Sequence, residues 1–270
     1  MDTVSETPRS LHPMTTLKRD VGNCHRLSIR NFPSGDVEIM AIKHEPDQRL
    51  GVKGKKPRKN IEKKYMDLST INKSRSRAKK KVRHKSMTMQ ADRMLTLTFQ
   101  FNLTDIGMAW DVLNYFNKLM RHEFGKDYCY IAVPEYQKRG AVHFHLALHG
   151  YYHVKVVRKL WLRAAGKFGG NVDITSPKKY GKNSWNPRRI ARYLSKYITK
   201  SDSVSFNKKR YSSTRTLIPP EPLIEWLPFT INGAGNVIGV MSDILEYLTE
   251  QKPSTMWEIN GYLSIKFLST

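Results

Sequence analysis

Between Met94 and Lys200 the sequence switches repeatedly between two hydrophobic periods, and this switching restricts the fold more than any other feature. Strand-forming residues at alternate positions predict strands at 94–99, 130–133, 142–148 and 171–174. Apolar residues three and four apart predict helices at 105–124, 156–165 and 187–200. The order is strand, helix, strand, strand, helix, strand, helix, with a hairpin in the middle. This order favours an α+β fold in which helices pack on an antiparallel sheet.

The chain carries a large excess of positive charge. Its 270 residues include 47 Lys and Arg against 23 Asp and Glu, a formal net charge of +24. A charge of this size favours a polyanionic partner, and nucleic acid is the first candidate. Fifteen of the basic residues lie between positions 53 and 85, where only two acids occur. The alternative interpretation is a solvated basic tail that has no specific partner.

Several classes of protein are disfavoured. Two cysteines without C-x-x-C spacing argue against a disulfide scaffold and a structural zinc site, and favour a reducing compartment. The longest uncharged run, residues 226–242, is 17 residues long and contains proline and glycine, so no membrane span is predicted. We find no secretory signal and no glycine-rich lysine motif. We therefore expect a cytoplasmic protein that uses no nucleotide cofactor.

Changes in composition divide the chain into four parts. Residues 1–52 are predicted to form a tail and a hairpin, 53–86 a basic arm and helix, 87–215 the main domain, and 216–270 a C-terminal extension. A basic helix from Ser69 to Lys85 is a candidate clamp on phosphates. The candidate nucleic-acid-binding residues are Arg75, Arg77, Lys79, Lys80, Lys81, Arg83, Arg189 and Arg192.

The predicted hairpin contains the most informative pattern for chemistry. His143 and His145 are two apart on one strand, so both project from the same face, while Phe144 and its apolar neighbours take the other. Two imidazoles placed in this way form half a metal site. An ordinary pair of strand histidines without a ligand role is the alternative.

The turn of this hairpin decides the third ligand. If residues 138–140 form a three-residue loop with Gly140 in the left-handed conformation, Glu135 lies directly opposite His143. A two-residue loop would put Glu135 on the other face, and Gln137 is the fallback ligand. Two nitrogens and one carboxylate oxygen suit Mg²⁺ or Mn²⁺ acting on phosphate, or Zn²⁺.

The predicted helix at 187–200 carries two tyrosines in register. Tyr193 and Tyr197 are one helical turn apart, beside an apolar stripe that would pack on the sheet. Each has a lysine three residues later, Lys196 and Lys200. A nearby ammonium and a metal-polarised phosphate would favour attack by a phenolate. Half-buried packing tyrosines are the alternative.

Together these segments resemble a known family. The strand Leu95-Thr-Leu-Thr-Phe99, the strand His143-Phe-His145, the segment Asn171-Val-Asp-Ile174 and the helix Ala191-Arg-Tyr-Leu-Ser-Lys-Tyr-Ile-Thr-Lys200 occur in the order and at the spacing of HUH endonucleases. Rolling-circle replication initiators of single-stranded-DNA phages and related plasmids are the nearest likeness. The segment Arg210-Tyr-Ser-Ser-Thr-Arg215 also resembles the one that follows the tyrosine helix in such proteins.

The resemblance implies a ferredoxin-like domain with a central five-stranded antiparallel sheet. It implies Mg²⁺ or Mn²⁺ held by His143, His145 and Glu135. It also implies that Tyr193 and Tyr197 cut and rejoin DNA in turn through a 5′-phosphotyrosine, with Lys196 and Lys200 assisting. The free 3′ hydroxyl would then prime synthesis.

The expected substrate is single-stranded or hairpin origin DNA in the cytoplasm of a bacterial host. Because no helicase motif is present, unwinding and synthesis would need a host helicase and polymerase. Two other functions remain open at this point. One is the same chemistry in a transposase or a mobilisation relaxase, and the other is a non-catalytic basic regulator that binds nucleic acid.

Overall fold

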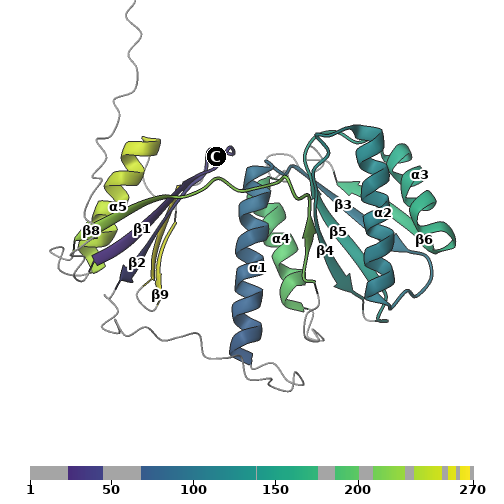
Figure 1. The fold of residues 1–270 in the computed structure, drawn as a ribbon, viewed down its shortest axis with the longest axis horizontal. Helices are drawn as coiled ribbons and strands as arrows, with labels where there is room; N and C mark the ends of the chain where they lie inside the picture. Colours follow the sequence, from purple (N-terminus) through teal and green to yellow (C-terminus); the bar gives the residue numbers. More distant parts are fainter. Residues whose placement is uncertain are drawn as a thin grey trace, which may run out of the picture. The chain divides into compact units, whose positions relative to one another are not determined.

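The structure is a computed structural model of the chain, shown in Figure 1. It describes residues 24–44, 68–137, 139–175, 186–200, 209–228, 234–250, 255–259 and 262–267. The chain divides into two compact units, and each is described by itself. The smaller unit comprises residues 1–30, 37–56 and 222–267, and the larger comprises residues 31–36, 57–221 and 268–270.

The larger unit is built on a five-stranded antiparallel sheet. Its strand order is β6-β3-β5-β4-β7, so β5 lies at the centre. The strands are β3 (Arg93–Phe99), β4 (Ile131–Tyr136), β5 (Val142–Leu148), β6 (Gly169–Thr175) and β7 (Ser212–Ser213). This sheet confirms the predicted α+β class, and the predicted hairpin supplies its two middle strands β4 and β5.

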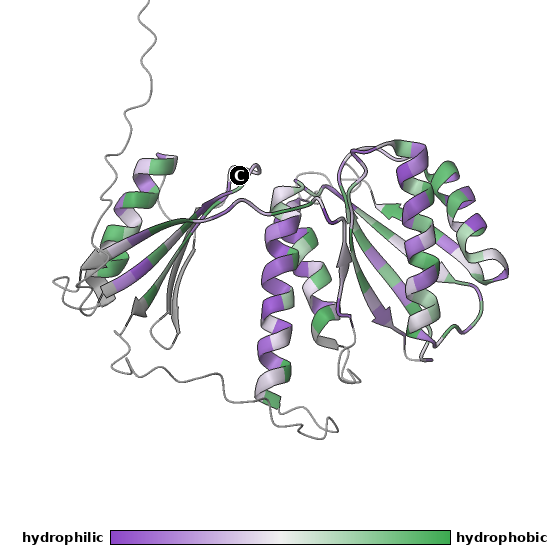
Figure 2. Cartoon of the chain, in the orientation of Figure 1, coloured by the Kyte–Doolittle hydropathy of each residue, from purple (hydrophilic) through white to green (hydrophobic). Residues whose placement is uncertain are grey.

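Helices cover both faces of this sheet (Figure 1). One face carries α2 (Ile106–Phe124) and α3 (Val154–Ala165), which is followed by the short 3₁₀ helix η1 (Gly166–Phe168). The opposite face carries α1 (Leu68–Thr88) and α4 (Pro187–Lys200). Figure 2 shows α1 as mostly hydrophilic along its length, as its many lysines and arginines require.

Each face therefore has its own hydrophobic core. On the α2–α3 side, Phe144, Trp161 and Phe116 are fully buried and their neighbours pack around them. On the α1–α4 side the buried residues include Val82, Leu194 and Ile131. All seven residues of β5 are buried, so the face that bears the histidines is covered as well. The sequence pattern identified only the apolar face of this strand as buried.

The ends of α2 follow the rules of helix capping. The Asp105 side chain accepts hydrogen bonds from the backbone N–H groups of Gly107 at 2.7 Å and Met108 at 3.2 Å. At the other end, the N–H of Gly125 donates to the Arg121 carbonyl, and Gly125 has φ 84°. Both ends lie where the sequence predicted them.

The end of α3 differs from the prediction. The helix stops at Gly166, and Gly169 and Gly170 begin β6 instead of ending the helix. A Cβ on Gly170 would lie 2.7 Å from the Thr98 carbonyl oxygen and 2.8 Å from the Gln100 nitrogen. Glycine at position 170 therefore serves the close approach of β6 to β3.

The smaller unit contains a second five-stranded sheet of order β8-β1-β2-β10-β9. Its strands are β1 (Cys24–Asn31), β2 (Val37–His44), β8 (Leu223–Pro228), β9 (Thr255–Ile259) and β10 (Tyr262–Phe267). Helix α5 (Ala234–Thr249) packs on it through Val237, Met241 and Leu245, which contact buried residues of β1 and β2. The predicted hairpin, helix and last strand are present here, whereas β8 and β9 were not predicted.

Candidate active site

The hairpin of β4 and β5 has the register that the metal-site prediction requires. Glu135 pairs directly with His143. The N–H of Gln137 donates to the Ala141 carbonyl at 2.9 Å, and the N–H of Gly140 donates to the Gln137 carbonyl at 2.8 Å. Gly140 has φ 85°, the left-handed conformation that the three-residue loop needs. Lys138 lies outside the described residues.

His145 is held by polar contacts at both ring nitrogens. Its Nε2 lies 2.7 Å from Oε2 of Glu135, and its Nδ1 lies 3.2 Å from Oγ1 of Thr96 on the neighbouring strand. Only 5% of His145 is exposed. The imidazole is therefore fixed in orientation, and the carboxylate of Glu135 is drawn to the histidine side of the hairpin.

His143 has a different environment. It is 9% exposed, and its Nε2 is buried without a hydrogen-bond partner among the described residues. Burial lowers the pKa of His143, and the adjacent His145 lowers it further, while Glu135 opposes the shift. A neutral imidazole with an unsatisfied buried nitrogen is suited to receive a cation or a hydrogen-bonding ligand.

Helix α4 covers this site because of how it begins and which face it buries. Asn186 accepts a hydrogen bond from the N–H of Arg189 at 2.9 Å, and Pro187 occupies the first helical position. Ile190, Leu194 and Ile198 form the predicted stripe and are at most 1% exposed. They pack with Ile131 and Val133 of β4 and Ala147 of β5.

The packing of α4 brings both predicted tyrosines to His145. The ring of Tyr197 stacks on the imidazole, with centroids 4.3 Å apart and planes at 14°. The ring of Tyr193 meets the same imidazole edge-on at 5.6 Å, and the two tyrosine rings are 5.2 Å apart. The three rings therefore form one cluster at the histidine face of the hairpin.

The two tyrosines differ in burial. Tyr197 is 8% exposed, whereas Tyr193 is half-buried. Burial raises the pKa of Tyr197, and a hydrogen bond with Tyr193 and the negative charge of Glu135 raise it further. The phenol of Tyr193 is thus the more accessible of the pair.

The two predicted lysines are only partly placed. Lys196 is exposed, and its Nζ lies 5.7 Å from the centroid of the Tyr193 ring. This is within the range of a cation–π contact, so the ammonium stands beside the more accessible tyrosine. Lys200 is the last residue of α4, and its side chain lies outside the described part of the structure.

The donor set has the right chemistry for a divalent cation. Two imidazoles and one carboxylate meet on one face, and one imidazole nitrogen is buried without a partner among the described residues. No group of three or more His, Cys, Asp or Glu side chains within the described ranges is close enough together to count as a formed metal site. Gln137, the alternative ligand, instead accepts a hydrogen bond from Nε of Arg139 at 3.1 Å.

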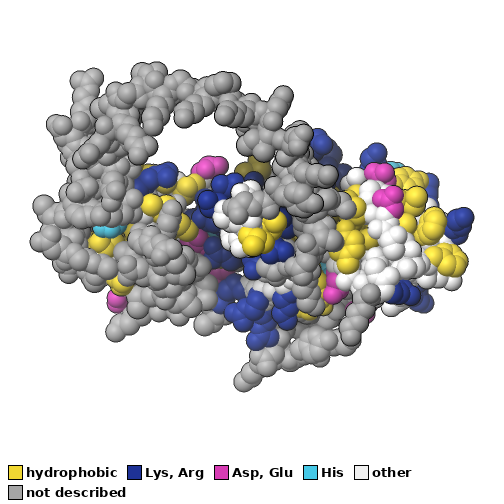
Figure 3. Space-filling model, turned by 90° about the horizontal axis from the view of Figure 1, so that it is seen from below, with side chains coloured by type: hydrophobic (Ala, Val, Ile, Leu, Met, Phe, Trp, Pro, Cys, Tyr) yellow, Lys and Arg dark blue, Asp and Glu magenta, His cyan; other side chains and the backbone are white. Residues whose placement is uncertain are grey.

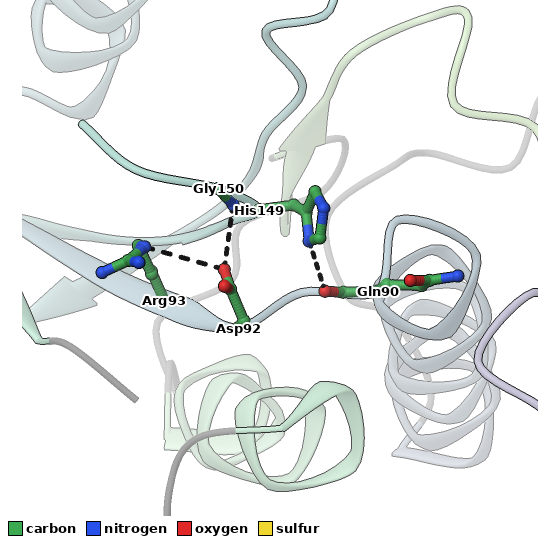
Figure 4. Close-up of polar contacts among 5 residues, drawn as sticks. All are labelled: Gln90, Asp92, Arg93, His149 and Gly150. Atoms are coloured by element: carbon green, nitrogen blue, oxygen red, sulfur yellow. Dashed lines mark hydrogen bonds and ion pairs between the residues drawn. The ribbon is translucent and has the colours of Figure 1, made fainter. Parts of the chain in front are cut away.

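His149 shares the parity of the two histidines but lies at the far end of their strand (Figure 4). Its Nδ1 is 2.8 Å from the carbonyl oxygen of Gln90. Beside it, Asp92 accepts a hydrogen bond from the N–H of Gly150 at 3.0 Å and lies 3.9 Å from Nε of Arg93. These contacts connect the end of β5 to the start of β3 and are structural.

The basic residues predicted to bind nucleic acid are divided between exposed and packed positions. Arg77, Lys80 and Lys81 of α1, and Arg189 and Arg192 of α4, are exposed, whereas Arg75, Lys79 and Arg83 are half-buried. Figure 3 shows Lys and Arg side chains gathered around α1, which is seen there close to end-on. The basic arm at 53–64 lies outside the described residues.

Some residues around the site were not identified from the sequence. Thr96, which contacts His145, is one of two threonines that alternate with leucines in β3, and the period of two could have placed it beside the histidines. Lys85 donates to the Leu217 carbonyl, and Nε of Arg210 donates to Oγ of Ser74 at 3.1 Å. No local sequence signal predicts such contacts between distant segments.

Comparison with known proteins agrees with this geometry. Residues 92–202 match the family model of the replication-associated protein ORF2. The matched span runs from the start of β3 to the end of α4, so it contains Glu135, both histidines and both tyrosines. This confirms the predicted likeness to rolling-circle replication initiators. No curated protein and no solved structure matches the chain. No helix among the described residues has the length and apolar character needed to cross a membrane.

Proposed function

Because residues 92–202 match a replication-associated family, we propose that the protein nicks one DNA strand at a replication origin. A tyrosine hydroxyl oxygen attacks the scissile phosphorus, and the bond from phosphorus to the 3′ oxygen breaks. The phenol loses its proton and the departing 3′ oxygen gains one. The products are a 5′-phosphotyrosine and a free 3′ hydroxyl that primes rolling-circle synthesis. One phosphodiester replaces another, so the exchange needs no ATP.

One arrangement carries this proposal. The phenol rings of Tyr193 and Tyr197 both contact the imidazole of His145, which in turn contacts Glu135 across the hairpin from His143. Nucleophile and phosphate-activating groups must lie within reach of the same phosphodiester, and this cluster meets that requirement. Tyrosines that served only the core would not need this polar neighbourhood.

His143, His145 and Glu135 would hold Mg²⁺ or Mn²⁺. When bound, the cation would polarise the phosphate and neutralise the charge that develops during attack. The residues of the chain have the task of orientation: Thr96 and Glu135 contact the two ring nitrogens of His145 and fix the ring.

We assign the first cut to Tyr193 because a nucleophile must meet its substrate. Tyr193 is half-buried, whereas Tyr197 is covered by packing and stacked on His145. Lys196 stands beside the Tyr193 ring and is suited to steer the phosphate. Tyr197 would act in the second cut and the rejoining step, with Lys200 as the corresponding lysine.

The exposed cations of α1 and α4 would hold the DNA backbone through contacts that weaken with salt. The substrate would be single-stranded or hairpin origin DNA in the bacterial cytoplasm. A host helicase would unwind the template, and a host polymerase would extend the free 3′ hydroxyl.

A covalent-adduct assay tests the proposal. Single-stranded oligonucleotides that tile the origin region of the replicon encoding the chain are labelled at the 3′ end and incubated with the protein and Mn²⁺. The label should move with the protein through SDS gel electrophoresis, because the protein joins the 5′ phosphate of the labelled fragment. Peptide mapping should place the label on Tyr193 or Tyr197, and a chelator should abolish it.

Matched variants make this assay specific. Combined Tyr193→Phe and Tyr197→Phe should abolish the adduct, whereas Tyr115→Phe, which alters an exposed tyrosine on α2, should leave it unchanged. An adduct that persists in the double variant would refute the assignment. DNA binding without any adduct from the unchanged chain would support a non-catalytic regulator instead.

A further inference from the structure

A second polar feature lies on the side of the larger unit away from the tyrosines. A groove of about 550 Å³ opens between α2 and the segment 209–216, which includes the edge strand β7. Its α2 wall consists of Asn114, Asn117, Lys118 and Arg121, which share one face of the helix. Helix α2 packs on the sheet face opposite α4, so this groove is separate from the proposed active site.

The lining of the groove is strongly one-sided in charge. Lys118 and Arg121 face it from α2, and Lys209 and Arg215 face it from the other wall. None of the described lining residues is acidic. Burial lowers the pKa of Lys209, and the positive charge of Arg215 lowers it further. The two cations on this wall therefore repel each other, and a bound anion would relieve that repulsion.

The remaining polar groups of the groove are suited to donate hydrogen bonds. Hydroxyls are contributed by Ser212, Ser213, Thr214, Thr216 and Tyr130. Asn117 is 8% exposed, and its Oδ1 accepts a hydrogen bond from the Tyr128 hydroxyl at 2.7 Å. Its Nδ2 is buried and has no hydrogen-bond partner among the described residues. A buried amide donor left without an acceptor is costly, so an acceptor from a ligand would stabilise it.

We propose that this groove binds the phosphate backbone of a nucleic-acid strand, as a second DNA contact apart from the tyrosine site. Four cations and several neutral donors, with no acidic side chain among the described lining residues, match the acceptor oxygens of phosphodiesters. The identification of the anion as DNA rests on the proposed function. The need for an anion rests on the groove itself.

The size and position of the groove favour a polymer over a single phosphate ion. Its volume is that of sites for ligands with many atoms, so one phosphate would leave much of the cationic lining without a partner. Lys209 also lies 5.1 Å from the ring centroid of Trp110, beside the groove. This aromatic contact keeps an ammonium at the wall without neutralising its charge.

The test compares two variants of the full chain that lose the same charge. Lys118→Gln with Arg121→Gln removes two exposed cations from the groove, and Lys155→Gln with Lys159→Gln removes two exposed cations from α3. Fluorescence anisotropy measures the affinity of each for labelled oligothymidine at several salt concentrations. Oligothymidine lacks an origin, and omission of divalent ions prevents cleavage.

The groove variant should bind several-fold more weakly than the α3 control. Its slope of log affinity against log salt should be shallower by about 1.4, since each lost single-strand phosphate contact removes roughly 0.7. The control should keep the slope of the unchanged chain. Arg215→Gln, from the opposite wall, should reproduce about half of the change. Equal slopes and affinities for the groove and control variants would overturn the proposal.

Two further measurements separate the remaining outcomes. If inorganic phosphate raises the melting temperature of the unchanged chain but not of the groove variant, while both bind DNA equally, the groove is a free-phosphate site and the nucleic-acid proposal fails. At saturating DNA the groove variant should still form the covalent adduct. Failure of the unchanged chain to form an adduct would refute the proposed function and leave the affinity result valid.

Discussion

Replacement of Thr96 by valine tests the support of the candidate metal site with the smallest change in shape. The Oγ1 of Thr96 lies 3.2 Å from Nδ1 of His145, whose other nitrogen is 2.7 Å from Glu135. A hydroxyl can donate to or accept from an imidazole nitrogen, so it supports either tautomer. Valine keeps the β-branched shape that suits strand β3 but offers neither function.

The size of the effect follows from burial. His145 is 5% exposed, so its Nδ1 would lose its partner with little access to water. Leaving a buried polar atom unsatisfied costs about 1–3 kcal/mol. The melting temperature should fall by roughly 2–4 °C for each kcal/mol in a domain of this size. Loss of a partner that orients a metal-binding histidine also weakens metal affinity by roughly 10–100-fold.

Thr98→Val is the matched control. Thr98 lies two residues along the same strand, and its hydroxyl donates to the backbone carbonyl of Asn171 at 3.0 Å instead of contacting an imidazole. Titration calorimetry with Mn²⁺ and thermal unfolding should be measured for both variants. Thr96→Val should lower both metal affinity and stability, whereas Thr98→Val should leave metal affinity unchanged. Identical Mn²⁺ affinities for Thr96→Val and the unchanged chain would show that Thr96 does not support a ligand.

Two further predictions concern the scaffold that holds the site. Leu194→Ala should destabilise the chain by about 2–5 kcal/mol, because Leu194 is 0% exposed and the change leaves a cavity between α4 and the sheet. Chemical denaturation measures this loss, and a change below about 1 kcal/mol would contradict the burial of the stripe. Gly170→Ala should disrupt the pairing of β6 with β3, because the new Cβ would lie 2.7 Å from the Thr98 carbonyl oxygen. Gly239→Ala on α5 is its control: nothing lies within 4 Å of the new Cβ, and melting should be unchanged or rise by the helix propensity of about 1 kcal/mol. Equal melting of the two alanine variants would show that the approach at Gly170 is not tight.

The features that the sequence predicted well are those set by local rules. Asp105 and Gly125 mark the ends of α2 because capping depends on only a few neighbouring residues. The pairing of Glu135 with His143 follows from one turn, since Gly140 in the left-handed conformation determines the register of the whole hairpin. Strand periodicity then placed both histidines on one face.

Features that depend on distant segments were not predictable in the same way. The strand pattern did not show that α1 and α4 cover the histidine face, because this depends on helices far away in the sequence. Strand β7 has two residues, too few for a period to appear. The end of α3 was misjudged because Gly169 and Gly170 resemble a helix terminator, whereas close contact with β3 is what requires glycine at position 170.

Burial of the site alters how its two tyrosines should be understood. Helix α4 contributes the buried stripe of Ile190, Leu194 and Ile198 to the core, and the same helix carries both phenols. The stripe and the tyrosines cannot move independently, because a rigid helix couples them. A cavity under Leu194 should therefore shift Tyr193 and Tyr197 relative to His145 as well as destabilise the fold. Positioning for chemistry and hydrophobic packing are thus one property of this helix, and catalytic geometry is expected to be lost along with core packing.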